Sequence, residues 1–245
     1  MIALVDTDSI IHSACTASID DYPSGFEEDI DIAKEYFISR IDAIPESLTE
    51  NTGKDVEQMI LFTQGVVNFR KIIYPDYKSK RKSKPPLLGE LNQWVVDEYS
   101  AHVCHGAETD DYVSSWWYQN HDIYGRDNVC IVANDKDYKQ IPCLFMDIYP
   151  PRFGQITDVT PNEANYNFFH QIITGDSTDG YIGLKGKGKK FASDLLVLGD
   201  SFNTLLYKTY KAYLKHAKRP RDEFRLAYNM AKLREDIKHL PNLIF

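Results

Sequence analysis

The sequence lacks the features that mark membrane proteins and secreted, disulfide-stabilised proteins. No apolar run reaches the roughly 18 residues that a membrane span requires, so we expect no membrane partner. The N-terminus has no basic start and reaches Asp6 and Asp8 at once, unlike a secretory signal peptide. The four cysteines are scattered without a CxxC pair, which favours buried free thiols in a reducing cytoplasm.

Positive charge is scarce in total but concentrated in three stretches. The net charge is −8, which alone argues against a nucleic-acid partner. Yet the ranges 70–84, 185–190 and 208–221 hold seventeen of the 28 Lys and Arg residues. Nine acids also cluster in the sequence, and without them the net charge would be +1 rather than −8. They are Asp6, Asp8, Glu108, Asp110, Asp111, Asp135, Asp137, Asp176 and Asp179. If bound cations neutralise those acids, the remaining surface can attract phosphate, although any one basic run could equally be a solvated face.

Short apolar runs alternate with helical patterns over the first 160 residues. Expected strands lie at 1–5, 58–63, 101–104, 129–133 and 144–148, and expected helices at 31–44, 87–99 and 110–119. Pro45 is expected to end the first of these helices. This alternation is typical of an α/β core with a mostly parallel sheet. After Pro161 the strand patterns stop, and helices are expected at 161–174, 189–198, 201–218 and 222–238.

Acidic residues stand where the expected strands end. Asp6 and Asp135 each follow a strand, at the edge where parallel sheets bind ligands. Gathering several carboxylates without cations would cost several kcal/mol of repulsion. Hard divalent ions such as Mg²⁺ or Mn²⁺ accept oxygen ligands, and a pair roughly 4 Å apart supports phosphodiester hydrolysis. For Asp8, Asp111 and Asp137, helix capping or surface charge is the alternative interpretation.

Two basic elements could hold phosphates. The range 183–190 alternates glycine and lysine before an expected helix, so its backbone amides can approach a strand of duplex closely. Arg70 and the range 77–82 combine cations with an aromatic ring that could stack on an end base. A disordered basic loop is the alternative for the second element.

Five motifs follow one another in a recognisable order: DTDS (6–9), FRK with YPDYKSKRK (69–82), GAETDD (106–111), ANDKDYKQIP (133–142) and GDSTDGYIGLKGKG (175–188). In this order the chain resembles the flap endonuclease / 5′→3′ exonuclease family, above all the short replication exonucleases of T-odd bacteriophages. The resemblance is collinear over residues 1 to about 190 and looser beyond.

The resemblance implies a fold and a division of the chain. Residues 1–160 would form a PIN-like α/β nuclease core with a mostly parallel sheet and a helical arch at 74–100. Residues 161–245 would form a helical DNA-binding region with a helix–three-turn–helix motif at about 172–198.

The resemblance also implies site residues. Metal ligands would be Asp6, Glu108 and Asp110 for one ion and Asp135, Asp137 and Asp176 for the other, with Asp111 and Asp179 close behind. Catalysis would depend on Lys78, Arg81, Asp6, Asp110 and Asp135. DNA contacts would come from Arg70, Tyr77, Lys78, Lys80, Arg81, Gly183, Lys185, Gly186, Lys187, Gly188 and Lys189.

The family's chemistry suggests cofactors and substrates, and two alternative functions stay open. Two Mg²⁺ ions would be bound, Mn²⁺ could substitute, and a monovalent cation such as K⁺ could sit at 183–189. Substrates would be duplex DNA with a 5′ end, flap or nick, and RNA–DNA hybrids, during phage replication in the cytoplasm of an infected bacterium, with no obligate protein partner. The alternatives are a catalytically weak, structure-specific DNA-binding protein and a PIN-type ribonuclease.

One position departs from the family pattern. Relatives carry an aspartate just before the FR element, near the first metal. Here the range 62–70 contains no acid, and Gln64 or Thr63 occupies the place. An amide oxygen offers Mg²⁺ no net charge, so we expect the first ion to be held less tightly unless Asp8 substitutes.

Overall fold

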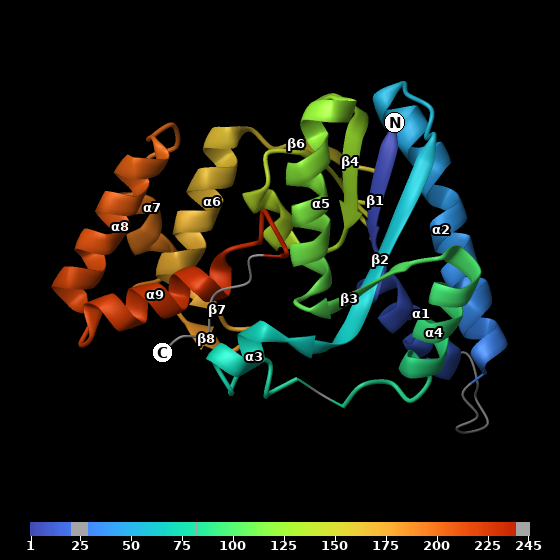
Figure 1. The fold of residues 1–245 in the computed structure, drawn as a ribbon, viewed down its shortest axis with the longest axis horizontal. Helices are drawn as coiled ribbons and strands as arrows, with labels where there is room; N and C mark the ends of the chain where they lie inside the picture. The colour runs from blue at the N-terminus through green and yellow to red at the C-terminus, as the bar shows by residue number, and fades with distance from the viewer. Residues whose placement is uncertain (21–28, 82, 239–245) are drawn as a thin grey trace.

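A computed structural model of the chain describes residues 1–20, 29–81 and 83–238. Its centre is a six-stranded sheet (Figure 1). The strands are β1 (Ile2–Asp6), β2 (Gln58–Asn68), β3 (His102–Gly106), β4 (Val129–Ala133), β5 (Leu144–Asp147) and β6 (Ile156–Asp158). Their order is β3-β2-β1-β4-β5-β6, with every neighbouring pair parallel except β5 and β6. The expected α/β class with a mostly parallel sheet is therefore confirmed.

Helices cover both faces of the sheet, which explains why β1 and β4 are apolar throughout. Ala3 and Val5 pack toward one face, beneath α1 (Asp8–Asp20), α2 (Ile30–Thr52) and α4 (Leu88–Tyr99). Ile2 and Leu4 pack toward the other face, beneath α5 (Thr109–Tyr124). Because the strands are parallel, their carboxyl ends meet at one edge, and Asp6 lies there.

A helical region with its own core follows the sheet. It comprises α6 (Pro161–Thr174), α7 (Lys189–Leu195), α8 (Phe202–His216) and α9 (Pro220–Ala231), which lie together at one end of the molecule (Figure 1). Buried side chains such as Phe169, Ile172, Leu205 and Tyr213 join these helices. That the chain folds as two separate domains divided at residue 160 stays a prediction.

Several expectations about single elements were wrong. No strand was expected after Pro161, but β7 (Gly175–Asp176) and β8 (Tyr181–Ile182) lie there, and strands of two residues are too short to form a pattern. Pro45 does not end α2, since the buried face of Ile41, Ile44 and Leu48 continues past it.

The C-terminal helix also differs from expectation, whereas the arch at 74–100 stays a prediction. Between α3 (Phe69–Ile73) and α4, the described residues form turns rather than a helix. Helix α9 ends at Ala231, and the range 232–238 is not helical. Two short 3-10 helices, η1 (Arg126–Asn128) and η2 (Lys136–Gln140), flank β4. In the described ranges no helix is both long and apolar enough to cross a membrane.

Candidate active site

Carboxylates gather at the carboxyl edge of the sheet. Asp6 ends β1, and Asp135 caps η2 directly after β4 by accepting the Asp137 amide at 2.9 Å. Glu108 caps α5, and Asp176 lies in β7. The acids come from four separate stretches of chain, as the sequence motifs predict.

Several of these acids repel one another, and nearby cations compensate this repulsion only in part. Burial, and then the neighbouring Asp8, raises the pKa of Asp6 from 3.8 to about 8. Burial, and then Asp135, raises the pKa of Asp137 to about 7. Burial, and then Asp111, raises the pKa of Asp110 well above its ordinary value. Within the described part of the chain, no Lys, Arg or His forms an ion pair with Asp6, Asp110 or Asp137.

Other acids are paired with cations. Glu108 forms ion pairs with Lys78 and, at 3.3 Å, with Arg70. Burial alone would raise the pKa of Glu108, but these two cations outweigh it and lower the pKa. Lys136 Nζ lies 2.7 Å from Asp176 and likewise outweighs burial to lower the pKa of that carboxyl.

The donor set fits divalent cations. Oδ1 of Asp110 is buried, and no described residue donates a hydrogen bond to it. The ligands on offer are carboxylate oxygens, which Mg²⁺ and Mn²⁺ prefer. As placed, no three His, Cys, Asp or Glu side chains of the described residues are arranged to hold an ion. Two of the expected ligands, Glu108 and Asp176, are held in ion pairs by Lys78 and Lys136.

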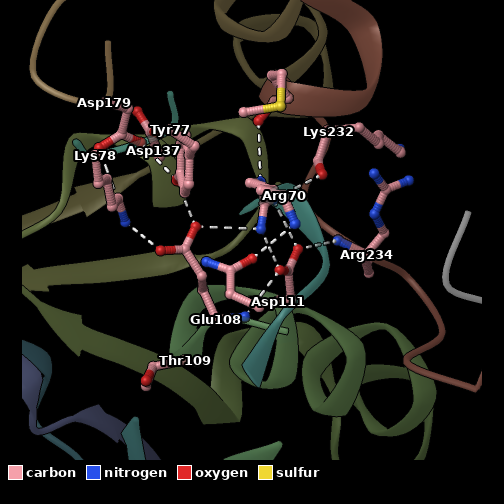
Figure 2. A network of polar contacts seen from close by, with 12 residues as sticks. Arg70, Tyr77, Lys78, Glu108, Thr109, Asp111, Asp137, Asp179, Lys232 and Arg234 are labelled. Carbon is pink, nitrogen blue, oxygen red and sulfur yellow. Dashed lines mark hydrogen bonds and ion pairs between the residues drawn. The ribbon is translucent and has the colours of Figure 1, made fainter. Parts of the chain in front are cut away.

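Three expected site residues are buried and bound to other side chains, and their roles at the site stay predictions. Asp111 is completely buried, and Arg70 binds both of its oxygens, so Asp111 has no free face for a metal. Arg70 is only 2% exposed and is not placed to contact DNA. Tyr77 is also 2% exposed and donates to Glu108 and Asp179, so its ring cannot stack on an end base in this arrangement. Figure 2 shows these residues in one network of contacts.

Lys78, Lys80 and Arg81, the described basic residues of the 77–82 motif, present cations at the rim of the site. The backbone of Lys78 has a φ of +55°, and its amide donates to the Asp179 carbonyl at 2.8 Å. Arg81 binds the Asp179 carboxylate at 2.8 Å, while about half of its side chain is exposed. Lys80 is exposed. The segment therefore rests on the turn between β7 and β8 and keeps basic groups toward solvent.

The glycine- and lysine-rich loop follows β8. Gly183 lies so close to β7 that an added Cβ would be 2.4 Å from the Gly175 nitrogen. Gly186, with a φ of +74°, and Gly188 have open space around them. Lys185 and Lys189 are exposed, and Lys187 lies over the Phe191 ring. The loop can therefore offer lysines to a ligand, and its role in DNA binding stays a prediction.

The position that lacks the family's acid lies beside another acid. The backbone N–H of Gln64 donates to Oδ1 of Asp8 at 2.8 Å, and the Thr109 hydroxyl donates to Oδ2 at 2.7 Å. Asp8 therefore lies beside the position of the missing acid, and its role at the first metal site stays a prediction. Sequence reasoning missed Tyr138 and Lys136, which bind Asp6 and Asp176, although both lie inside the motif of residues 133–142.

Comparison with known proteins supports one family. No family model matches the chain. The flap endonuclease Xni of Shewanella frigidimarina is 28% identical over 206 residues, covering 76% of this chain and 77% of that protein. Xni of Shewanella sp. strain MR-4 is 28% identical over 190 residues, 72% of each chain.

Solved structures share the fold. The bacteriophage T5 flap endonuclease, in a complex with DNA and metal ions, superposes with a TM-score of 0.55 at 12% identity over 93% of this chain and 99% of that one. The T5 5′-exonuclease with zinc ions gives 0.55 at 14% identity, over 95% of this chain and 100% of that one. In sequence the chain is thus similar to flap endonucleases, and in fold it is similar to the T5 flap endonuclease and 5′-exonuclease, whose PIN-like architecture it shares.

Proposed function

We propose that the protein is a divalent-metal-dependent nuclease that hydrolyses phosphodiesters of DNA at 5′ ends, nicks and flaps. The names of its sequence relatives support the activity, and the DNA and metal ions bound to the T5 enzyme support the partners. The role we propose is removal of RNA primers and 5′ ends during phage DNA replication in the cytoplasm of an infected bacterium. RNA–DNA hybrids would then be substrates as well.

One observation carries the proposal. Asp6, Asp110 and Asp137 stand close to other acids at the sheet edge, and burial and mutual repulsion raise their pKa values. Such an arrangement is unfavourable in a protein unless something positive binds there. Perturbed carboxyls beside exposed cations are typical of a site that binds metal and a phosphate group.

The ligands would divide between two ions. Asp6, Glu108 and Asp110 would hold one, and Asp135, Asp137 and Asp176 would hold the other, with Asp179 nearby. Two Mg²⁺ ions, or Mn²⁺, would supply an activated water and neutralise charge on the phosphate. Lys78 would donate to the scissile phosphate once it leaves Glu108, and Arg81 would support it.

Basic residues away from the acids would hold the DNA. Lys80, Lys185, Lys187 and Lys189 would contact phosphates and position the duplex without recognising sequence. We also propose that the loop of residues 183–189 takes a monovalent cation such as K⁺. Each phosphate contact of this kind makes binding weaker at high salt.

The test uses 5′-labelled flap, nicked duplex and RNA–DNA hybrid, each with Mg²⁺, Mn²⁺ or EDTA. We expect cleavage only with a divalent ion. Asp110→Asn should abolish cleavage while retaining DNA binding, because it removes a ligand without touching the basic residues. Cleavage that persists in EDTA would overturn the proposed chemistry.

The absence of an acid at position 64 favours one alternative function, that of a structure-specific DNA-binding protein with weak catalysis. If the missing acid weakens the first metal site, Gln64→Asp should move the Mg²⁺ activation curve to lower concentration. Asp8→Ala should move it in the opposite direction, because Asp8 adjoins Gln64. Cleavage rates against free Mg²⁺ for the three proteins decide this. An unchanged midpoint in both variants would show that neither residue influences the metals, and binding without cleavage at any Mg²⁺ concentration would favour this alternative.

A further inference from the structure

The segment after α9 lies across the first turns of α5. We call Lys232–Lys238 the strap. Leu233 is 4% exposed and belongs to the same core cluster as Val113 and Trp117 of α5. The Ile237 amide donates to Ser115 Oγ at 3.0 Å. In Figure 1 the strap leaves α9 and passes beside α5.

Arg70 joins the strap to the carboxylates at the carboxyl edge of the sheet, which we call the acid edge. Its guanidinium forms a two-pronged ion pair with Asp111 and also approaches Glu108 at 3.3 Å. Nε donates to the Met230 carbonyl at 3.1 Å, and Nη2 donates to the Lys232 carbonyl at 3.2 Å. A buried ion pair is stable only when its remaining polar atoms are also bonded, and here α9 and the strap supply those partners.

Asp111 continues the connection into the site. Its Oδ1 accepts the Arg234 amide at 3.2 Å, and its Oδ2 accepts the Glu108 amide at 3.2 Å (Figure 2). Glu108 and Asp110, which flank this turn, are proposed metal ligands. Fixing the Asp111 side chain therefore fixes the backbone that presents both carboxylates.

Met230 extends the same connection to the 77–82 motif. It packs with Tyr77 and Tyr181 in a separate apolar cluster. The Tyr77 hydroxyl donates to Glu108 and, at 2.8 Å, to Asp179. The end of α9 thus supports both the residue before Lys78 and the acid that Lys78 binds.

We infer that Arg70, Asp111 and the strap form a positioning device that holds Glu108, Asp110 and Lys78 in place for cleavage. The inference rests on the proposed function. Under the proposed function, Arg70, Asp111 and the strap contact neither the metal ions nor the DNA. Loosening them should therefore impair turnover and metal affinity while leaving the affinity for DNA nearly intact.

Two mild variants test the device, because they leave every proposed ligand in place. Leu233→Ala removes the buried anchor of the strap, and Ser115→Ala removes the acceptor of the Ile237 amide. Asp111→Asn is the strong variant, because it removes the charge that Arg70 binds. The matched control is Ile41→Ala, a buried position of α2 on the opposite face of the sheet.

Measurements are single-turnover cleavage of a saturating 5′ flap, the Mg²⁺ midpoint, the rise in Tm on adding Mg²⁺, and the DNA Kd in EDTA. For Leu233→Ala and Asp111→Asn we expect about a tenfold to hundredfold loss of rate, since small displacements of reacting groups cost this much. The Mg²⁺ midpoint should rise and the Mg²⁺-induced gain in Tm should shrink. The DNA Kd should stay within about twofold, because the phosphate contacts lie elsewhere.

Ile41→Ala should lower Tm without these effects at a temperature where all proteins are folded. Amide hydrogen exchange gives a second readout, because the Ile237 amide should exchange faster in Ser115→Ala than in wild type. If Asp111→Asn does not fold, the two mild variants still decide. If the strap variants lower Tm but keep the cleavage rate and the Mg²⁺ midpoint, as expected for Ile41→Ala, the positioning role is wrong. It is also wrong if they lose as much DNA affinity as cleavage rate, and in both cases the proposed function stands. A wild type that never cleaves would overturn the proposed function instead.

Discussion

At the scale of single residues, the site divides into paired and unpaired carboxylates. Glu108 and Asp176 each have a lysine partner, and their pKa values are lowered. Asp6 accepts hydrogen bonds from Tyr138 at 2.7 Å and from the Asp8 amide at 3.0 Å, but its pKa is raised. Hydrogen bonds orient a carboxylate, whereas a full positive charge is needed to offset burial beside another acid. The unpaired acids are therefore the ones that depend most on a bound ion.

Stability should depend on pH through Asp6. Its pKa is raised from 3.8 in the unfolded chain to about 8. The stability that the protonated Asp6 contributes to the folded state is therefore fully present below pH 3.8 and is lost as pH rises through 8. In EDTA the free energy of unfolding of wild type should fall between pH 5 and 8. Asp6→Asn should flatten this slope and be more stable than wild type at pH 8 by about 1 kcal/mol or more, since one pKa unit is worth about 1.4 kcal/mol.

Urea unfolding in EDTA at pH 5, 6.5 and 8 measures this effect. Saturating Mg²⁺ should stabilise wild type more than Asp6→Asn at pH 8, because the ion replaces the proton. Identical pH slopes for the two proteins would contradict the assignment of the raised pKa to Asp6.

Lysines near and far from the acids should behave differently. Lys78→Ala should lower the single-turnover rate by about a hundredfold or more, a usual cost of removing one stabilising donor. Its effect on DNA Kd should be small, because Lys78 is largely engaged with Glu108 and Asp179 in the free protein. Lys187→Ala should instead weaken binding and reduce the log–log salt slope by about one unit. Equal effects of both variants on Kd and rate would contradict this separation.

At the scale of elements, strongly patterned segments could be predicted to the residue. The bounds of β4 and α6 agree with the sequence expectation. For α6 the reason is local, since Thr160 and Glu163 form a capping box and Gly175 ends the helix. The course of residues 232–238 could not be predicted, because the strap is held by Asp111 and Ser115, more than a hundred residues earlier in the chain.

The β7–β8 pair gives a stability prediction for the glycine-rich loop. In Gly183→Ala the new Cβ would lie 2.4 Å from backbone atoms of Gly175 in β7 and Ile173 in α6, which cannot move without disturbing the β7–β8 pair and the end of α6. We expect a loss of about 1–3 kcal/mol, as for other overpacked sites, and weaker DNA binding. Gly188→Ala is the matched control, since nothing lies within 4 Å of its Cβ position. Thermal unfolding and DNA Kd check both, and equal Tm values for the two variants would disprove the clash.

At the scale of the whole molecule, the sequence predicted which acids meet but not which cations meet them. The α/β pattern predicted a mostly parallel sheet, and parallel strands bring Asp6 and Asp135 to one edge. Arg70 was expected to contact DNA as part of the basic stretch 70–84. Its burial depends on Asp111 and Lys232, which lie 41 and 162 residues away. Sequence spacing carries no information about such long-range partners unless the tertiary fold is known.

The charge distribution leads to a last prediction, about how metal ions affect DNA binding. With a net charge of −8, the protein repels phosphate at long range unless ions neutralise the acid edge. Asp110→Asn, which should not cleave, should therefore bind a 5′-flap duplex more tightly in Mg²⁺ than in NaCl of equal ionic strength. Fluorescence anisotropy at several salt concentrations measures this difference.

The control for that measurement is Asp110→Asn combined with Lys187→Ala. The double variant should bind more weakly in both salts yet keep the same gain from Mg²⁺, because Lys187 contacts the duplex away from the acid edge. Mg²⁺ also screens phosphate directly and thereby weakens contacts with lysine, so a gain in affinity would have to come from the protein's own acids. Equal or weaker binding in Mg²⁺ at matched ionic strength would mean that the acid edge does not face the DNA.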